Sequence, residues 1–389
     1  PVERPNIVLI MADDMGYADA GCFGGKHIQT PNIDRLAGDG MRFTQCYAGS
    51  TVCAPSRSVL MTGLNTGHTR VRGNFGKGGV KGLGGGKGRI PLRAEDITVA
   101  EVLKRAGYAT GITGKWGLGE PTTEGTPNRQ GFDEWFGYLN QRRAHSFYPT
   151  FIWLNEGRFD LPGNAGGKRQ QYTHDLFTGF ALSFIRKNKH KPFFLYLPFN
   201  APHGASSLDP SIRGAAQAPE AFKAMYPGLL EQPQLVPGRR YDKPAMVPSR
   251  AKRRLEYAAS ITCMDAAIGT VLDLLDQYEV ADNTIVIFFG DNGRMEPRGI
   301  HWLWDSGIHV PMIIHYPKGV SAPAQHKVGG VNDQVISLID LTATTLEMAG
   351  IAKPLGMQGR RFLGREIDPP RRFAFSARDR IDETALRMR

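Results

Sequence analysis

Short apolar runs recur along the chain and limit the folds that it can adopt. They are NIVLIM (6–11), YATGIT (108–113), PFFLYLPF (192–199), TIVIFFG (284–290) and VPMIIHY (310–316). Runs of this length, rich in β-branched and aromatic residues, are typical of strands that are buried on both faces. Such strands belong in the middle of a sheet that is covered on both sides, so we expect a sheet of this kind.

Helical patterns lie between several of these runs. They cover residues 97–107, 173–188, 254–278 and 334–350, and residues 58–62 continue as a shorter helix. The first and last of the four end in Gly107 and Gly350, and glycine is common just beyond a helix C-terminus. Helices that alternate with buried strands predict an α/β fold, in which a large, mostly parallel sheet is flanked by helices on both faces.

A length of 389 residues suits one large domain with a smaller appendage. We predict an α/β domain over residues 1–320 and a C-terminal region over 321–389, made of a helix and an incomplete small subdomain. Residues 73–88 are glycine-dense and basic but lack the P-loop pattern. They form either a loop near an anion site or a flexible connector. Residues 204–253 are expected to run over the surface.

Charge and cysteine content narrow the class of protein. The net charge of +11 favours anionic partners such as nucleic acid, an anionic membrane or an acidic polysaccharide. No apolar run approaches the ~20 residues that a membrane span needs, so none is expected. The four cysteines form no C-x-x-C pair, which argues against a structural zinc site and against a disulfide scaffold.

Polar side chains follow four of the predicted strands. Ligands bind beyond the carboxyl ends of strands in open parallel sheets, so these positions are candidates for a site. Each one alone could also be an ordinary turn, since turns favour Asp and Asn. The residues are Asp13 and Asp14, Lys115, Asn200 and His203, and Asp291 and Asn292.

Three carboxylates and one amide in this group are hard oxygen ligands. Asp13, Asp14, Asp291 and Asn292 would suit Ca²⁺ or Mg²⁺ better than zinc, because they include neither histidine nor thiolate. The alternative is that both pairs only cap and turn the chain.

The stretch TVCAPSRSVLMTG (51–63) places a cysteine and an arginine together at the start of a helix. One interpretation is a cysteine nucleophile, because Arg57 and the helix N-terminus would lower the pKa of the Cys53 thiol. That interpretation does not explain the oxygen-rich metal site.

The run C-A-P-S-R at 53–57, followed by MTG, resembles the signature of the type I sulfatases of the alkaline phosphatase superfamily. Further blocks, such as GYATGITGKWGLG, PFFLYLPFNAPH and FFGDNG, match in the expected order. The resemblance implies an alkaline phosphatase-like fold and a C-terminal subdomain shorter than usual. It also implies that a maturation enzyme converts Cys53 to formylglycine, whose hydrate is the nucleophile and a ligand of Ca²⁺ or, less often, Mg²⁺.

The resemblance also implies roles for single residues. The metal ligands would be Asp13, Asp14, Asp291, Asn292 and residue 53; Arg57 would hold the formylglycine, and Lys115 and His203 the sulfate. His203 would protonate the leaving alcohol, and Asp291 would be the base. Gly117 stands where many sulfatases have histidine, with His68 as a possible replacement, and a family lysine falls nearest His301. Further candidates for contact with a sugar are Arg143, His145 and Trp302.

The predicted function is therefore sulfate ester hydrolysis, with a sulfated carbohydrate as substrate. A phosphodiester or phosphonate monoester hydrolase is one alternative, and a non-catalytic anion-binding relative is another, favoured by Gly117 and the altered 301–309 region. A nucleic-acid binder would rest on charge alone, so no nucleic-acid partner is expected. We expect a periplasmic or extracellular location from the family, although no signal peptide is visible. The oligomeric state is left open.

Overall fold

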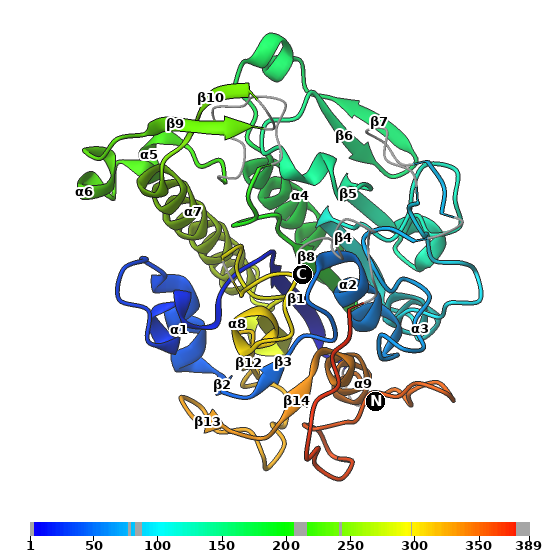
Figure 1. Cartoon of the computed structure of the whole chain (residues 1–389). Coiled ribbons are helices and arrows are strands. Elements are labelled where there is room, and N and C mark those ends of the chain that lie inside the picture. The colour runs from blue at the N-terminus through cyan, green and yellow to red at the C-terminus, as the bar shows by residue number, and fades with distance from the viewer. Residues whose placement is uncertain are drawn as a thin grey trace.

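The computed structural model describes residues 4–76, 79–81, 88–205, 216–240, 243–296 and 298–378. Within these residues, one ten-stranded sheet runs through the middle of the molecule, in the order β13-β2-β12-β11-β1-β8-β4-β5-β6-β7 (Figure 1). Its strands are β1 (Asn6–Ala12), β2 (Met41–Phe43), β4 (Ala109–Lys115), β5 (Glu134–Tyr138), β6 (Phe151–Leu154), β7 (Gly157–Asp160), β8 (Phe193–Pro198), β11 (Thr284–Gly290), β12 (Met312–His315) and β13 (Val331–Asn332).

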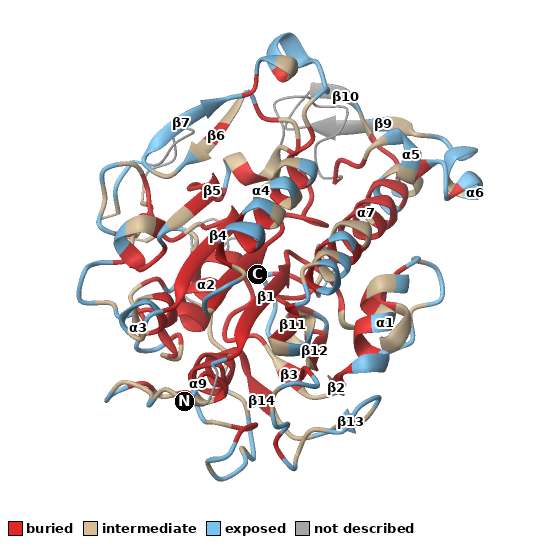
Figure 2. Ribbon diagram, turned by 180° about the vertical axis from the view of Figure 1, so that it is seen from behind, coloured by how far each residue is buried: buried red, intermediate tan, exposed pale blue. Residues whose placement is uncertain are grey.

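The five central strands, β11, β1, β8, β4 and β5, are parallel to one another. Every residue of β1, β4, β8 and β11 is buried, as the apolar runs predict (Figure 2). The register of β1 against β11 pairs Asn6 with Thr284 and Ala12 with Gly290. The two strands therefore end at the same level, and the residues that follow them begin side by side.

The centre of the sheet is parallel, as predicted, and the antiparallel pairings lie among the outer strands. β12 lies antiparallel to β11, and β2, β6 and β7 also have antiparallel neighbours, so the sheet is mixed. A parallel return would need a crossover that traverses a face of the sheet. The chain between β11 and β12 has only one short described helix, α8 (Asp305–Ile308), so it turns back at the same edge.

Helices cover both faces of the sheet, as predicted. Alternate residues of β1 point to two separate cores: Ile7 and Leu9 join one, and Val8 and Ile10 join the other. The first core also contains residues of α2 (Cys53–Thr62), α3 (Val99–Arg105) and α9 (Leu338–Met348). The second contains residues of α1 (Pro31–Asp39), α4 (Thr173–Asn188) and α7 (Arg250–Gln277), and α4 lies beside α7 (Figure 1).

The long helix α7 is apolar enough to cross a bilayer by length and composition, but 72% of its most apolar window is buried inside the fold. Its burial accounts for its apolar sequence. The helix begins at Arg250, four residues before the predicted start.

The segment 204–253 is more ordered than expected. It contains α5 (Glu220–Lys223), α6 (Pro227–Leu230) and an antiparallel hairpin of β9 (Leu235–Arg240) and β10 (Lys243–Pro248). Residues 206–215 and 241–242 of this segment, and 77–78 and 82–87 of the glycine-rich run, lie outside the described residues.

The start of the C-terminal region packs onto the main body. β14 (Ile336–Ser337) pairs in parallel with β3 (Cys46–Tyr47), and α9 contacts α2. The division of the chain at residue 320 stays a prediction, and residues 379–389 lie outside the described part.

Candidate active site

The carboxyl ends of the central strands converge on one buried cluster of charged side chains. Asp13 and Asp14 directly follow β1, Asp291 and Asn292 directly follow β11, and Lys115 is the last residue of β4. The three acids, the amide and the lysine are all fully buried. The in-register ends of β1 and β11 bring the two acidic pairs together, and the neighbouring strands supply the lysine and, after β8, His203.

Cys53 lies at this cluster as the first residue of α2 and is 2% exposed. Its Sγ is 3.3 Å from Asp13 Oδ1. Ligand atoms of Asp13, Asp14, Cys53 and His203 all lie within 4.8 Å of one another. The thiol, two acids and a histidine from three distant parts of the chain thus share one small volume.

Two buried cations lie against these acids. Lys115 Nζ is 2.6 Å from Asp13 Oδ2, and Arg57 Nη2 is 3.1 Å from Asp291 Oδ2 and 3.4 Å from Asp13 Oδ1. Arg57 also donates to the Lys115 carbonyl at 2.5 Å. The helix α2 therefore carries both Cys53 and the guanidinium that bridges two of the acids, one turn apart.

The three acids outnumber the two cations, and their pKa values differ accordingly. Burial alone would raise the pKa of Asp13, but Lys115 and Arg57 outweigh burial and hold it well below its usual range. Burial and the charge of Asp13 raise the pKa of Asp14 to about 7. The same two causes raise the pKa of Asp291 well above its usual range. An additional positive charge would therefore favour the ionised acids.

The oxygen atoms of the cluster fit a hard cation. Asn292 donates through Nδ2 to Asp14 Oδ1 at 2.7 Å, while its Oδ1 is buried and accepts no hydrogen bond from the described residues. A buried amide oxygen without a donor is costly unless a ligand satisfies it. Together with three carboxylates it provides the oxygen-rich donor set that Ca²⁺ and Mg²⁺ prefer.

The Cys53 thiol does not have the environment of a thiolate nucleophile. Burial and the adjacent charge of Asp13 raise the pKa of Cys53 well above its ordinary value, and they outweigh Lys115. Burial and the neighbouring acids thus oppose the activation that Arg57 and the helix N-terminus were expected to provide.

His203 faces the acids from the loop after β8. Its Nδ1 lies 2.7 Å from the Gly204 carbonyl, to which it donates, and its Nε2 is 3.3 Å from Asp14 Oδ2. Burial lowers the pKa of His203 to about 4. The ring of His145 stacks on that of His203 at 3.9 Å between centroids, so His145 borders the cluster.

Residues 5–351 match the family model described as Sulfatase. The chain belongs to the sulfatase family. This confirms the resemblance that the motif at Cys53 carries, and the residues matched cover the whole ten-stranded sheet.

Two sulfatases and one solved structure illustrate the relationship. N-acetylgalactosamine-6-sulfatase of Sus scrofa is 30% identical over 90% of this chain and 63% of its own length. Arylsulfatase of Klebsiella aerogenes is 31% identical over 77% of this chain and 68% of its own length. The crystal structure of Ps i-CgsB is 29% identical, with a TM-score of 0.71 over 92% of this chain and 75% of that one. This chain therefore spans less than two thirds of the length of the first relative.

At Gly117, where many sulfatases have histidine, another side chain fills the space. Gly117 has φ +80°, and a Cβ added there would lie 2.1 Å from Gln141 Nε2. Gln141 is 4% exposed, and neither of its side-chain amide atoms has a hydrogen-bond partner among the described residues. It lines a small cleft with Ala54, the residue after Cys53, and with Arg89. Sequence reasoning missed Gln141, because no motif marks a buried amide.

Four other candidates lie outside the cluster in this sulfatase structure. His68 is exposed and close to Gln358, so it does not replace a pocket histidine. His301 is also exposed, although its backbone N–H donates to Thr51 near Cys53. The remaining two are Trp302, which is 56% exposed, and Arg143, whose guanidinium stacks on Phe151.

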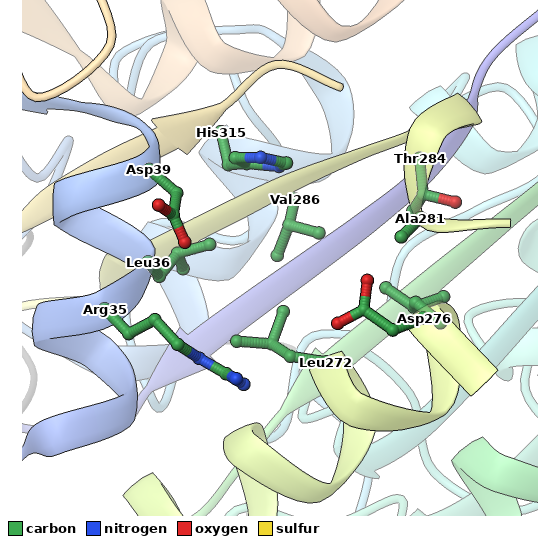
Figure 3. A pocket seen from close by; sticks show the side chains of 10 residues that line it. Arg35, Leu36, Asp39, Leu272, Asp276, Ala281, Thr284, Val286 and His315 are labelled. Atoms are coloured by element: carbon green, nitrogen blue, oxygen red, sulfur yellow. The ribbon is translucent and has the colours of Figure 1, made fainter. Parts of the chain in front are cut away.

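A cavity of about 110 Å³ lies at the opposite end of β11 (Figure 3). It is lined by Thr284, the first residue of β11, and by side chains of α1 and α7, whereas Asp291 follows the last residue of the strand. At about 3.3 Å per residue, seven residues separate the two ends by roughly 20 Å. This cavity is therefore not part of the cluster around Cys53.

Proposed function

We propose that the protein hydrolyses sulfate monoesters of carbohydrates, with a formylglycine made from Cys53 and a divalent cation, Ca²⁺ or Mg²⁺. One observation carries the proposal: Cys53 Sγ lies 3.3 Å from Asp13, within a buried cluster of three acids, Lys115 and Arg57. Sγ stands for the oxygen that the modified residue would present.

The chain's own residues suit a reaction that neutralises an anionic group and protonates a poor leaving group. Lys115 and Arg57 present fixed positive charge in a water-excluded site, where it interacts most strongly with sulfate oxygens. Asp13, Asp14, Asp291 and Asn292 would hold the cation, which when bound supplies further positive charge to those oxygens. A hydrated aldehyde at residue 53 would supply the attacking hydroxyl and a second hydroxyl through which sulfate is expelled.

Two groups can move the required protons. Asp291 lies beside Arg57 in the same buried cluster as Cys53, and its ionised form can accept the proton of the attacking hydroxyl. His203 Nε2 points at the acids and is the candidate proton donor to the leaving oxygen, and burial lowers the pKa of this ring to about 4 in the protein without substrate. His145, stacked on His203, restricts the orientation of that ring.

Carbohydrate substrates are supported by the relatives, one of which is an N-acetylgalactosamine-6-sulfatase, and by a structure of Ps i-CgsB in complex with k-i-k-neocarrahexaose. The net charge of +11 suits a polyanionic substrate. Such substrates occur outside the cytoplasm, so we propose a periplasmic or extracellular location and maturation by a formylglycine-generating enzyme.

The test is coexpression with a formylglycine-generating enzyme, mass spectrometry of the peptide that holds residue 53, and assays of released sulfate and phosphate. We expect an aldehyde at residue 53 and sulfate release from sulfated sugars, and loss of both in Cys53→Ala but not in Cys22→Ala. Aldehyde formation without sulfate release would overturn the proposal, and phosphate release alone would favour a phosphoester hydrolase.

A further inference from the structure

A cavity of about 410 Å³ opens beside the candidate active site, between the start of α7 and the loop after β11. This size falls in the usual range for small-molecule sites. We call it the arginine cleft, defined by Arg250, Arg253, Arg254, Tyr257, Arg294 and Glu296.

The arginine cleft adjoins the catalytic cluster. Pro202 and Gly204, which flank His203, also line it. The hydroxyl of Tyr257 is 3.2 Å from the backbone oxygen of Asp14. A molecule whose sulfate lies at Cys53 would therefore have the arginine cleft within reach of its neighbouring groups.

Within the part of the chain that the structure describes, most arginines of the arginine cleft have no acid as partner. Arg294 pairs with Asp19 at 3.2 Å and with Glu296 at 2.7 Å, so acids neutralise it. Arg253 donates to the Pro248 carbonyl. Arg250 and Arg254 are exposed, and neither has an ion pair with any acid among the described residues.

These arginines do not stabilise the helix that carries them. They lie in the first two turns of α7, whose first turn contains no acid, and the positive end of a helix dipole disfavours cations. An anion in the cavity would offset both the mutual repulsion of the arginines and their unfavourable position. Guanidinium groups bind sulfate and carboxylate with paired hydrogen bonds.

We propose that the arginine cleft binds a second anionic group, an O- or N-linked sulfate or a carboxylate, on the same carbohydrate whose sulfate ester lies at Cys53. The proposal rests on the proposed function and deepens it, because it makes the preferred substrate polyanionic.

The test measures binding and turnover separately. Binding is measured by calorimetry on protein with unconverted Cys53, and the probes are glucosamine 2-N,6-O-disulfate and a 6-sulfated disaccharide whose other charge is a uronic carboxylate. The variant is Arg250→Gln/Arg254→Gln, and the control is Arg186→Gln. Arg186 is an exposed arginine near the C-terminus of α4, which lies where the strands begin, at the opposite edge of the sheet.

We expect the double variant to raise the Kd for at least one probe about tenfold, because each exposed charge contact contributes a few-fold. The control should leave both Kd values unchanged. A rise for the disulfate alone assigns a sulfate group to the arginine cleft, and a rise for the uronate alone assigns a carboxylate. Unchanged Kd values in a variant with wild-type Tm, or no binding by the wild type, overturn the proposal.

Turnover separates this proposal from the proposed function. With formylglycine present, the double variant should lower kcat/KM for the affected probe about tenfold more than for 4-nitrophenyl sulfate, which has one anionic group. If the wild type binds the probes through the arginine cleft but releases no sulfate from any of them, the proposed function fails and the arginine cleft remains.

Discussion

The ammonium group of Lys115 lies 2.6 Å from the Asp13 carboxylate, and both side chains are fully buried. Arg57 contacts the same carboxylate from the other side at 3.4 Å. A buried charge is tolerated only when an opposite charge faces it, so these side chains depend on one another.

Replacing Lys115 therefore has a larger effect on stability than replacing an exposed lysine. Lys115→Met should lower the free energy of unfolding by about 3 kcal/mol, because it leaves buried acid charge uncompensated. Lys104, half-exposed and 2.8 Å from Asp133, is the control, and Lys104→Met should lose less than about 1 kcal/mol. Urea unfolding without added metal measures both free energies of unfolding. Equal losses in the two variants would contradict the mutual dependence of Lys115 and Asp13.

Divalent cations should stabilise the folded protein through the oxygen cluster. Adding Ca²⁺ should raise Tm, with about 2.7 kcal/mol gained at a concentration one hundred times Kd. Asn292→Ala removes the unpaired Oδ1 and should reduce that gain, whereas Asn283→Ala, at the other end of β11, should not. Thermal unfolding with Ca²⁺, Mg²⁺ and EDTA measures the effect. If none of Ca²⁺, Mg²⁺ and EDTA changed Tm, a cation site at the oxygen cluster would be excluded.

The space beside Gly117 is already taken by Gln141. Gly117→Ala should lower the free energy of unfolding by about 2 kcal/mol, about half from the positive φ and half from the clash with Gln141 Nε2. In a Gln141→Ala background the same change should cost only about 1 kcal/mol. Gly166→Ala, with φ +64° and open space around it, is the control for the backbone contribution. If Gly117→Ala lowered the free energy of unfolding equally with and without the Gln141 side chain, the clash with Gln141 would not be the cause of the loss.

His174 should make the fold sensitive to acid. It is fully buried on α4, its Nε2 is 3.0 Å from Asn200 Oδ1, and burial lowers its pKa to about 4. An unfolded histidine binds a proton below about pH 6.5, so the folded state loses stability as pH falls from 6.5 towards 4, by about 3 kcal/mol in total. Above pH 6.5 the residue contributes no pH dependence.

Comparing wild type with His174→Gln isolates this residue. The free energy of unfolding from urea titrations should fall more steeply between pH 7 and pH 4.5 in the wild type than in the variant. If the free energy of unfolding changed with pH in the same way in both proteins, His174 would have the same pKa in the folded and unfolded states.

The sequence predicts the centre of this molecule well because two simple constraints coincide there. The apolar runs at 6–11 and 284–290 can be buried only in the middle of a sheet, and parallel strands bring their carboxyl ends to one edge. Asp13 and Asp291 could therefore be placed together before any contact was known. The sulfatase resemblance added the chemistry of Cys53.

The edges were less predictable for physical reasons. An apolar run such as 310–316 predicts a strand but does not specify its direction, which depends on the path of the chain before it. The antiparallel direction of β12 was therefore not predicted. The hypothesis of a Cys53 thiolate considered Arg57 and the helix N-terminus but not the acids, and burial together with Asp13 raises the pKa of the thiol instead. His68 was named by residue type, whereas its location is exposed.

The pairing of Ala12 with Gly290 has a consequence for the order in which parts of the protein unfold. Hydrogen bonds between two adjacent core strands determine the distance between Asp13 and Asp291. This distance does not depend on the conformation of a flexible loop. Peripheral elements can therefore unfold while Asp13 and Asp291 keep their separation. Capacity to bind a cation should be among the last native properties that heating destroys.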